Sequence, residues 1–268
     1  MIKPIIVLTI SILLLKTGGV FTIEDALLLN LTTSIAALIV GLWLLKKHTR
    51  NKLAKPALYE SSVWIKSLIP LVLHSGLLIV NAQVGVVLLG IMSKPEDVAI
   101  FKVAFQGATL LTFGLTTINA VLAPHIVNYH LKGKINDLQN ILTFSIRVIF
   151  LISLPLLFVY IFWGDFFITL LFGKEYIDAY SVLVILSFGQ IVNLGCGSVG
   201  LVMQMLGSEK KIVSVSFISL VINITLSLLL INNFGVDGAA YASAISIVYW
   251  NLALAIHVKK SLGIRSYV

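Results

Sequence analysis

Long apolar segments with almost no charge dominate this sequence and restrict what it can fold into. Residues 67–92, 98–123 and 180–206 each exceed the ~20 residues that an α-helix needs to cross about 30 Å of hydrocarbon. Hydrophobic residues make up 59% of the chain and charged residues 11%, whereas soluble domains have about 45–50% and roughly 25%. So few charged side chains could not cover a water-soluble globule of 268 residues. The sequence therefore predicts an all-α polytopic membrane protein.

The apolar segments predict about eight transmembrane helices. They are residues 4–15, 26–45, 67–92, 98–123, 139–162, 180–206, 212–231 and 239–257. The first segment is short and lies between Lys3 and Lys16, as in a signal peptide, but no small-residue cleavage site follows it. We therefore expect it to span the membrane. Residues 166–176 are apolar but too short to span, and are predicted to form an interfacial helix on the outer side.

The basic residues indicate how the predicted helices are oriented. If eight spans alternate in direction, fourteen of the nineteen Lys and Arg residues fall on the side of both termini, and three fall on the other side. This bias predicts that both termini are cytoplasmic, by the positive-inside rule. The net charge of +8 is then a topology signal, with no nucleic-acid partner expected. The basic residues of the segment 46–66 are expected to contact anionic lipid headgroups.

Motifs for catalysis or for cofactor binding are missing from the sequence. Gly133-Lys134 lacks the preceding glycine and the following hydroxyl residue of a phosphate-binding loop. The five histidines have no metal-binding spacing, and Cys196 is the single cysteine. All eleven acidic residues lie in or near predicted loops, so the spans offer no carboxylate for acid–base chemistry. We expect no enzyme, no catalytic residue, no cofactor and no metal site.

Polar residues inside the predicted spans are candidates for function, because burying them in a membrane is costly. In the span 98–123, polar residues recur every three or four positions from Lys102 through Gln106 to Asn119, along one helix face. A similar face in the span 180–206 runs from Ser187 to Gln204. These two faces predict a wet cavity, with a helix-packing seam as the alternative. For a third face, Ser216 to Ser227, we favour the seam.

The residues most suited to line such a substrate cavity come from four predicted spans. They are Arg147, Lys102, Gln106, Asn119, Gln190, Asn193, His74 and Asn81. Arg147 has two interpretations. Its guanidinium group binds an anionic headgroup such as a diphosphate inside the cavity, or its long side chain extends to the lipid headgroups on the cytoplasmic side. The same two interpretations apply to Lys102, and His74 has the alternative of being a packed core histidine.

A series of short motifs in fixed order adds a family resemblance. The series comprises Phe172-Gly173-Lys174-Glu175-Tyr176, Gly189-Gln190-Ile191-Val192-Asn193, Leu206-Gly207-Ser208-Glu209-Lys210 and the segment 233–242, with Ile69-Pro70 and Leu122-Ala123-Pro124 before them. It resembles the polysaccharide (O-antigen, lipid-linked oligosaccharide) flippases of the multidrug/oligosaccharidyl-lipid/polysaccharide exporter superfamily. The resemblance covers about residues 67–260.

The resemblance implies two six-helix lobes around a central cavity. It also implies movement of an undecaprenyl-diphosphate-linked glycan from the cytoplasmic to the outer leaflet of a bacterial cytoplasmic (inner) membrane. Residues 1–45 would be the last two helices of an incomplete first lobe, 46–66 the connection between the lobes, 67–258 the second lobe and 259–268 a cytoplasmic tail. About four helices would be missing, so a second chain or a longer product would have to supply them.

Two departures from the family pattern keep other functions open. Relatives often carry an acidic residue near Gly85, where this chain reads Asn81-Ala82-Gln83-Val84-Gly85. A multidrug or small-molecule exporter of the same architecture is one alternative, although a cation-coupled drug pump would be expected to show membrane acids. The missing helices suggest a second alternative, a membrane remnant that transports nothing.

Overall fold

The computed structural model describes residues 23–49 and 61–264, and within them it is helical almost throughout, with no strand. The chain divides into two compact units, residues 1–61 and 62–268, which are described separately. The helices are α2 Ile23–Thr49, α3 Ser61–Met92, α4 Pro95–Leu110, α5 Phe113–Leu131, α6 Ile135–Phe172, α7 Ala179–Cys196, α8 Val199–Met205 and α9 Glu209–Leu262, with a short 3-10 turn, η1, at Lys174–Tyr176. The prediction of an all-α polytopic membrane protein is confirmed.

Helix α2 belongs to the first unit and contains the predicted span 26–45. Its apolar part, Leu28–Lys47, is long enough to cross a membrane and buries none of its residues within the protein. At its end the Lys47 ammonium lies 5.3 Å from the centre of the Trp43 ring. An aromatic ring next to a cation is typical of a helix end at the headgroup level. The predicted span 4–15 lies outside the described residues.

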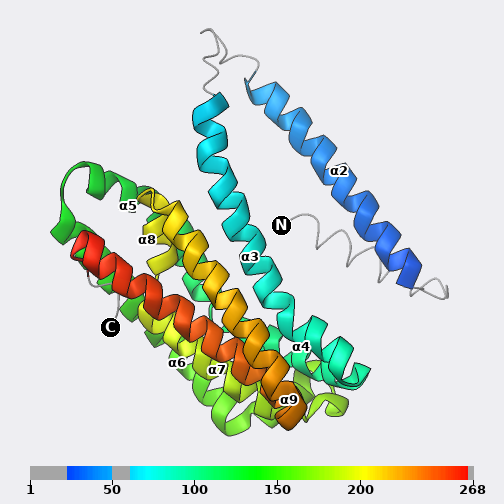
Figure 1. The fold of residues 1–268 in the computed structure, drawn as a ribbon. Helices are drawn as coiled ribbons and strands as arrows, with labels where there is room; N and C mark the ends of the chain where they lie inside the picture. Colours follow the sequence, from blue (N-terminus) through cyan, green and yellow to red (C-terminus); the bar gives the residue numbers. More distant parts are fainter. Residues whose placement is uncertain (1–22, 50–60, 265–268) are drawn as a thin grey trace. The chain divides into compact units, whose positions relative to one another are not determined.

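The second unit accounts for the other six predicted spans. In the described part of the chain, five helices including α2 are long and apolar enough to cross a membrane, and a sixth span results if α4 and α5 are taken together. Helix α9 has 54 residues, more than twice what one crossing needs, and breaks at Gly235 with φ 55° and ψ −129°. Its two halves run side by side in opposite directions (Figure 1), and Ser219 Oγ donates to the carbonyl of Ser246 at 2.9 Å. α9 is thus the predicted pair 212–231 and 239–257.

The predicted span 98–123 is a bent pair, in which α4 and α5 meet at an angle of 48°. The bend frees backbone carbonyls that water cannot reach inside a bundle. The Tyr160 hydroxyl donates to the carbonyl of Gly107 at 2.7 Å, and Ser153 Oγ donates to that of Leu111 at 3.0 Å. Broken helices are tolerated in membranes where side chains satisfy the backbone in this way.

The predicted interfacial helix at residues 166–176 has a counterpart in the short helical segment that follows a kink in α6. Its position at the membrane surface stays a prediction. Helix α6 extends past the predicted end of its span and continues to Phe172, with a kink at Trp163 (φ −136°, ψ 27°). The ring of Tyr180 packs against Gly164, where a Cβ atom would clash with it. This contact holds the segment after the kink against α7, and Gly173, with φ 101°, ends the helix.

Helix α7 lies at the centre of the second unit and packs against α4, α6 and α9, while α8 packs against α5 and α9. The turns before α4 and α7 and the break in α9 gather at one end of the bundle (Figure 1). Asp97, Asp178 and Asp237 line a common hollow there. The charge pattern predicts that this end faces outside. The three connections of the second unit that the predicted alternation of spans puts on the outer side do lie together at this end.

Candidate functional site: a polar cavity in the helix bundle

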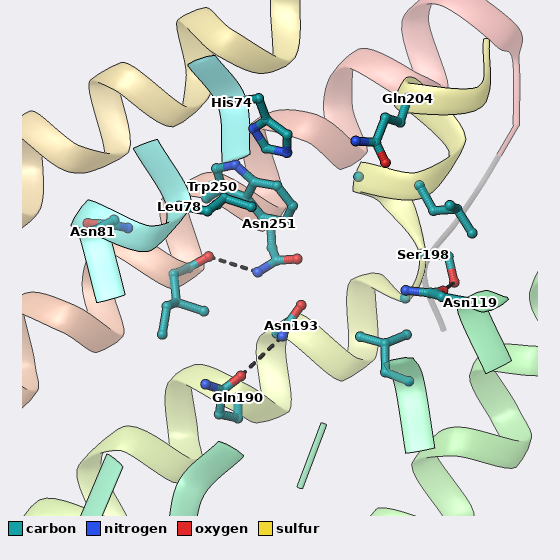
Figure 2. Close-up of a pocket in the computed structure, with 15 residues that line it drawn as sticks. His74, Leu78, Asn81, Asn119, Gln190, Asn193, Ser198, Gln204, Trp250 and Asn251 are labelled. Carbon is teal, nitrogen blue, oxygen red and sulfur yellow. Dashed lines mark hydrogen bonds between the residues drawn. The ribbon is translucent and has the colours of Figure 1, made fainter. Parts of the chain in front are cut away.

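The second unit contains a polar cavity of about 370 Å³ between five helices. Figure 2 shows amide side chains from opposite walls facing this space. The lining residues come from α3 (His74, Leu78, Asn81), α5 (Leu115, Asn119), α7 (Gln190, Asn193), the α7–α8 break and α8 (Gly197, Ser198, Gly200, Leu201, Gln204) and the second half of α9 (Ile247, Trp250, Asn251). A volume of this size lies at the small end of the range for small-molecule sites.

The break between α7 and α8 shapes one wall. Gly197 ends α7 with φ +64°, a conformation that side chains rarely adopt, and a Cβ atom there would clash with Ile146. The polar face predicted from Ser187 to Gln204 continues across this break. Gln190, Asn193 and Gln204 on this face line the cavity, whereas Ser187 bonds within its own helix to Leu183. Because the chain changes direction at this break, α8 lies beside the cavity. The polar residues predicted on one straight helix therefore form a curved wall.

The amide groups of the cavity are only partly used by one another. Asn193 Nδ2 donates to Gln190 Oε1 at 3.1 Å, and Ser198 Oγ donates to Asn119 Oδ1. On α3, Asn81 accepts a hydrogen bond at Oδ1 from Asn223. Asn81, Asn119, Gln190 and Asn193 each have a second polar atom in the side chain that makes no hydrogen bond to another described residue. The same is true of both polar atoms of Gln204.

Asn251 provides the clearest sign that the cavity takes a polar occupant. Its side chain is 1% exposed and its Nδ2 donates to the carbonyl of Ile247 at 2.9 Å, whereas its buried Oδ1 has no partner among the described residues. Figure 2 shows this oxygen directed into the cavity rather than at the Ile247 bond. A buried acceptor without a partner costs about 1–3 kcal/mol, and a ligand or water in the cavity would remove that cost.

His74 and Trp250 lie near each other at the top of Figure 2, and both bond to Ser216, which lies outside the described lining. Trp250 Nε1 donates to Ser216 Oγ at 2.9 Å, and His74 Nδ1 lies 3.0 Å from the same oxygen. The imidazole and indole rings are parallel within 4°. Because the indole only donates, Ser216 Oγ accepts from Trp250, and its hydroxyl links the two rings.

Five of the eight predicted cavity residues line this space and three do not. His74, Asn81, Asn119, Gln190 and Asn193 line it. Arg147, Lys102 and Gln106 are exposed on α6 and α4 and are absent from the described lining. Among the described residues that line the cavity there is no Asp, Glu, Lys or Arg. The described wall is therefore neutral apart from the titratable ring of His74.

The third polar face is a packing seam, as favoured from the sequence. Ser216 bonds to Trp250, Ser219 to Ser246, and Asn223 to Asn81. All these contacts join α9 to α3 or join the two halves of α9 to each other.

Sequence reasoning missed Asn251, Trp250 and Ser198. Asn251 is the single amide residue of the span 239–257, and the cost of placing an amide in a membrane span was a signal that sequence analysis could have used. Ser198 lies in the α7–α8 break, and only the folded backbone turns it toward Asn119.

The fold and the cavity define a polytopic membrane protein with a small polar compartment inside a helix bundle. The MatE family matches residues 70–229, which is more than half of the chain and includes most of the cavity. The chain therefore belongs to the MatE family, and its place in the multidrug/oligosaccharidyl-lipid/polysaccharide exporter superfamily is confirmed. A second family, described as polysaccharide biosynthesis protein, matches residues 1–130. These are transporter and flippase families, so the chain is not an enzyme.

A named relative is the probable low-salt glycan biosynthesis flippase Agl15 of Haloferax volcanii. It is 25% identical to this chain over 176 residues, which is 66% of this chain and 37% of the relative. The matched part thus spans less than half of the length of that flippase.

Proposed function

We propose that this chain works as a flippase, or as the larger part of one, that moves a lipid-linked oligosaccharide from the cytoplasmic to the outer leaflet. Membership of the MatE family, together with the match to the polysaccharide biosynthesis family, carries this proposal. The relative named as a glycan biosynthesis flippase supports it. In a bacterial cytoplasmic membrane the lipid would be undecaprenyl diphosphate.

In this proposal, residues 67–258 form one lobe of a two-lobe transporter, residues 46–66 form the connection between the lobes, and both termini are cytoplasmic. A polar cavity inside the lobe gives a glycan headgroup a path that avoids hydrocarbon, where unpaired hydroxyl groups are costly. His74, Asn81, Asn119, Gln190 and Asn193 supply its polar wall. Lys102 and Arg147 are exposed, and we assign them to lipid headgroups rather than to the cavity.

The experiment is a clean deletion of the locus, followed by assays of surface glycan and of lipid-linked intermediates. We expect the surface glycan to fall and the lipid-linked intermediate to accumulate on the cytoplasmic side. Re-expression of the full product should reverse both changes. Unchanged surface glycan, with no accumulation of the lipid-linked intermediate, would contradict the proposal. If the deletion strain instead becomes more sensitive to cationic drugs, the drug-exporter alternative is favoured.

A further inference from the structure

We propose that the cavity is a binding site for an uncharged, hydroxyl-bearing ring, and hence for a sugar residue of the glycan rather than for its diphosphate. This inference rests on the proposed flippase function for the identity of the ligand. It rests on the cavity itself for the ligand's chemistry.

The charge of the wall is the first argument. None of the described lining residues is acidic, and none is Lys or Arg. A diphosphate carries several negative charges and needs cationic or densely packed N–H donors. The two cations predicted to line a cavity, Arg147 and Lys102, are exposed and lie outside the described lining. The cavity therefore suits a neutral group.

The second argument is that the free polar atoms of the wall are of both kinds. Donors without a partner among the described residues are Nδ2 of Asn81 and Asn119 and Nε2 of Gln190. The acceptors that likewise have no partner among the described residues are Oδ1 of Asn193 and Oδ1 of Asn251. A metal cation would need acceptors alone and an anion would need donors alone, whereas a hydroxyl group donates and accepts at once.

The third argument is how closely the site is built. Asn251 and Gln190 are 1% and 6% exposed, so their amides are held by packing before any ligand arrives. Gly200 keeps α8 close to the ring of Trp250, where a Cβ atom would clash. A ring-shaped ligand would thus meet fixed amides and an indole, and would replace the missing partner of Asn251.

The test uses the full product of the locus, purified in lipid nanodiscs. Three probes are titrated by calorimetry: neutral oligosaccharide released from the cell's own surface polysaccharide together with a panel of neutral monosaccharides, inorganic pyrophosphate, and sodium chloride. We expect saturable binding of at least one neutral saccharide. Asn251→Leu should weaken it about five- to tenfold, the usual effect of one lost hydrogen bond.

Two further variants keep the test decisive. Gln204→Met removes a lining amide that has no hydrogen bond to the described residues, so its folding should be unaffected and its saccharide binding weakened. Asn233→Leu changes an exposed asparagine of the same helix as Asn251, outside the described lining, and should bind as the wild type does.

Absence of saccharide binding by the folded wild type overturns the inference. So does pyrophosphate or sodium binding that is lost in Asn251→Leu. The deletion assay gives a separate result. Normal saccharide binding with unchanged surface glycan would reject the flippase function and support the sugar site. Loss of surface glycan without saccharide binding would support the flippase function and reject the sugar site.

Discussion

Asn223 donates its Nδ2 to both the side-chain and the backbone oxygen of Asn81, at 2.8 and 3.1 Å, although the two residues are 142 positions apart. The bond joins the first half of α9 to the middle of α3. Asn223 is 1% exposed and in turn accepts from Ser227. Asn81 is itself one of the three α3 residues that line the cavity, with His74 and Leu78, so this contact sets the position of one cavity wall.

Replacing Asn223 by Ala should destabilise the folded protein by about 0.6 kcal/mol, the average for hydrogen bonds between membrane helices, and by at most about 1.7 kcal/mol. The loss should be seen as easier unfolding in mixed detergent micelles. A double-mutant cycle with Asn81→Ala isolates the pair, because removing both partners should cost less than the sum of the two single changes. Strictly additive effects would show that the contact contributes nothing. Asn233→Ala, at an exposed asparagine of the same helix, is the matched control.

Two nearby glycines should respond oppositely to the same substitution. Gly197 has φ +64° and its Cβ would meet Ile146, while Gly195 has open space around it. Gly197→Ala is therefore strained in both backbone and packing and should lower the melting temperature. Gly195→Ala places a better helix former within α7 and should leave stability unchanged or raise it by up to about 1 kcal/mol. Equal melting temperatures for the two variants would contradict the structure of the α7–α8 break.

The bend between α4 and α5 gives a third prediction. Tyr160→Phe removes the donor to the Gly107 carbonyl and leaves that carbonyl buried without its partner. We expect a destabilisation of about 1–3 kcal/mol by thermal unfolding in nanodiscs. Tyr241→Phe changes an exposed tyrosine whose hydroxyl bonds to no described residue, and it should unfold as the wild type does. A Tyr160 variant as stable as that control would mean that the freed carbonyl has another partner.

Much of the fold was predictable because a membrane imposes a length and a polarity on each helix. Seven of the eight predicted spans have a helical counterpart in the described residues, and the eighth lies outside them. The amide positions on α7 and α8 were predictable for the same reason, since polar residues in register must avoid lipid.

Other features depend on contacts between distant residues and could not be predicted from sequence periodicity. The kink in α6 at Trp163 is one such feature, and beside it Tyr180 packs on Gly164, two residues that no periodic pattern connects. Arg147 was assigned by residue type, and Lys102 by a polar face that the bend between α4 and α5 interrupts. The direction in which each points depends on how α6 and α4 rotate in the bundle, and a single helix pattern does not fix that rotation.

The proposed orientation is testable by cysteine labelling. In a Cys196→Ser background, Asn136→Cys and Glu175→Cys introduce thiols at exposed positions near opposite ends of the bundle. We expect a membrane-impermeant maleimide to label only position 175 in intact spheroplasts, and to label both after lysis. Labelling of position 136 alone would reverse the proposed topology.

An Arg147 variant distinguishes between two hypotheses, that the substrate binds in the neutral cavity or that it is held by a cation. Its side chain is exposed on α6 and is not part of the described lining. Arg147→Gln should therefore leave the folded protein stable, because exposed substitutions typically change folding stability by roughly 0.5 kcal/mol or less. Because the substitution removes nothing from the cavity, glycan export should stay close to wild type. Under the same conditions Asn251→Leu should reduce export at unchanged protein abundance, since it removes an acceptor from the cavity. Export is measured as surface glycan per cell, with membrane abundance determined by immunoblot. If Arg147→Gln abolishes export while Asn251→Leu does not, the substrate is held by charge outside this cavity, and the amides serve only to pack the helices.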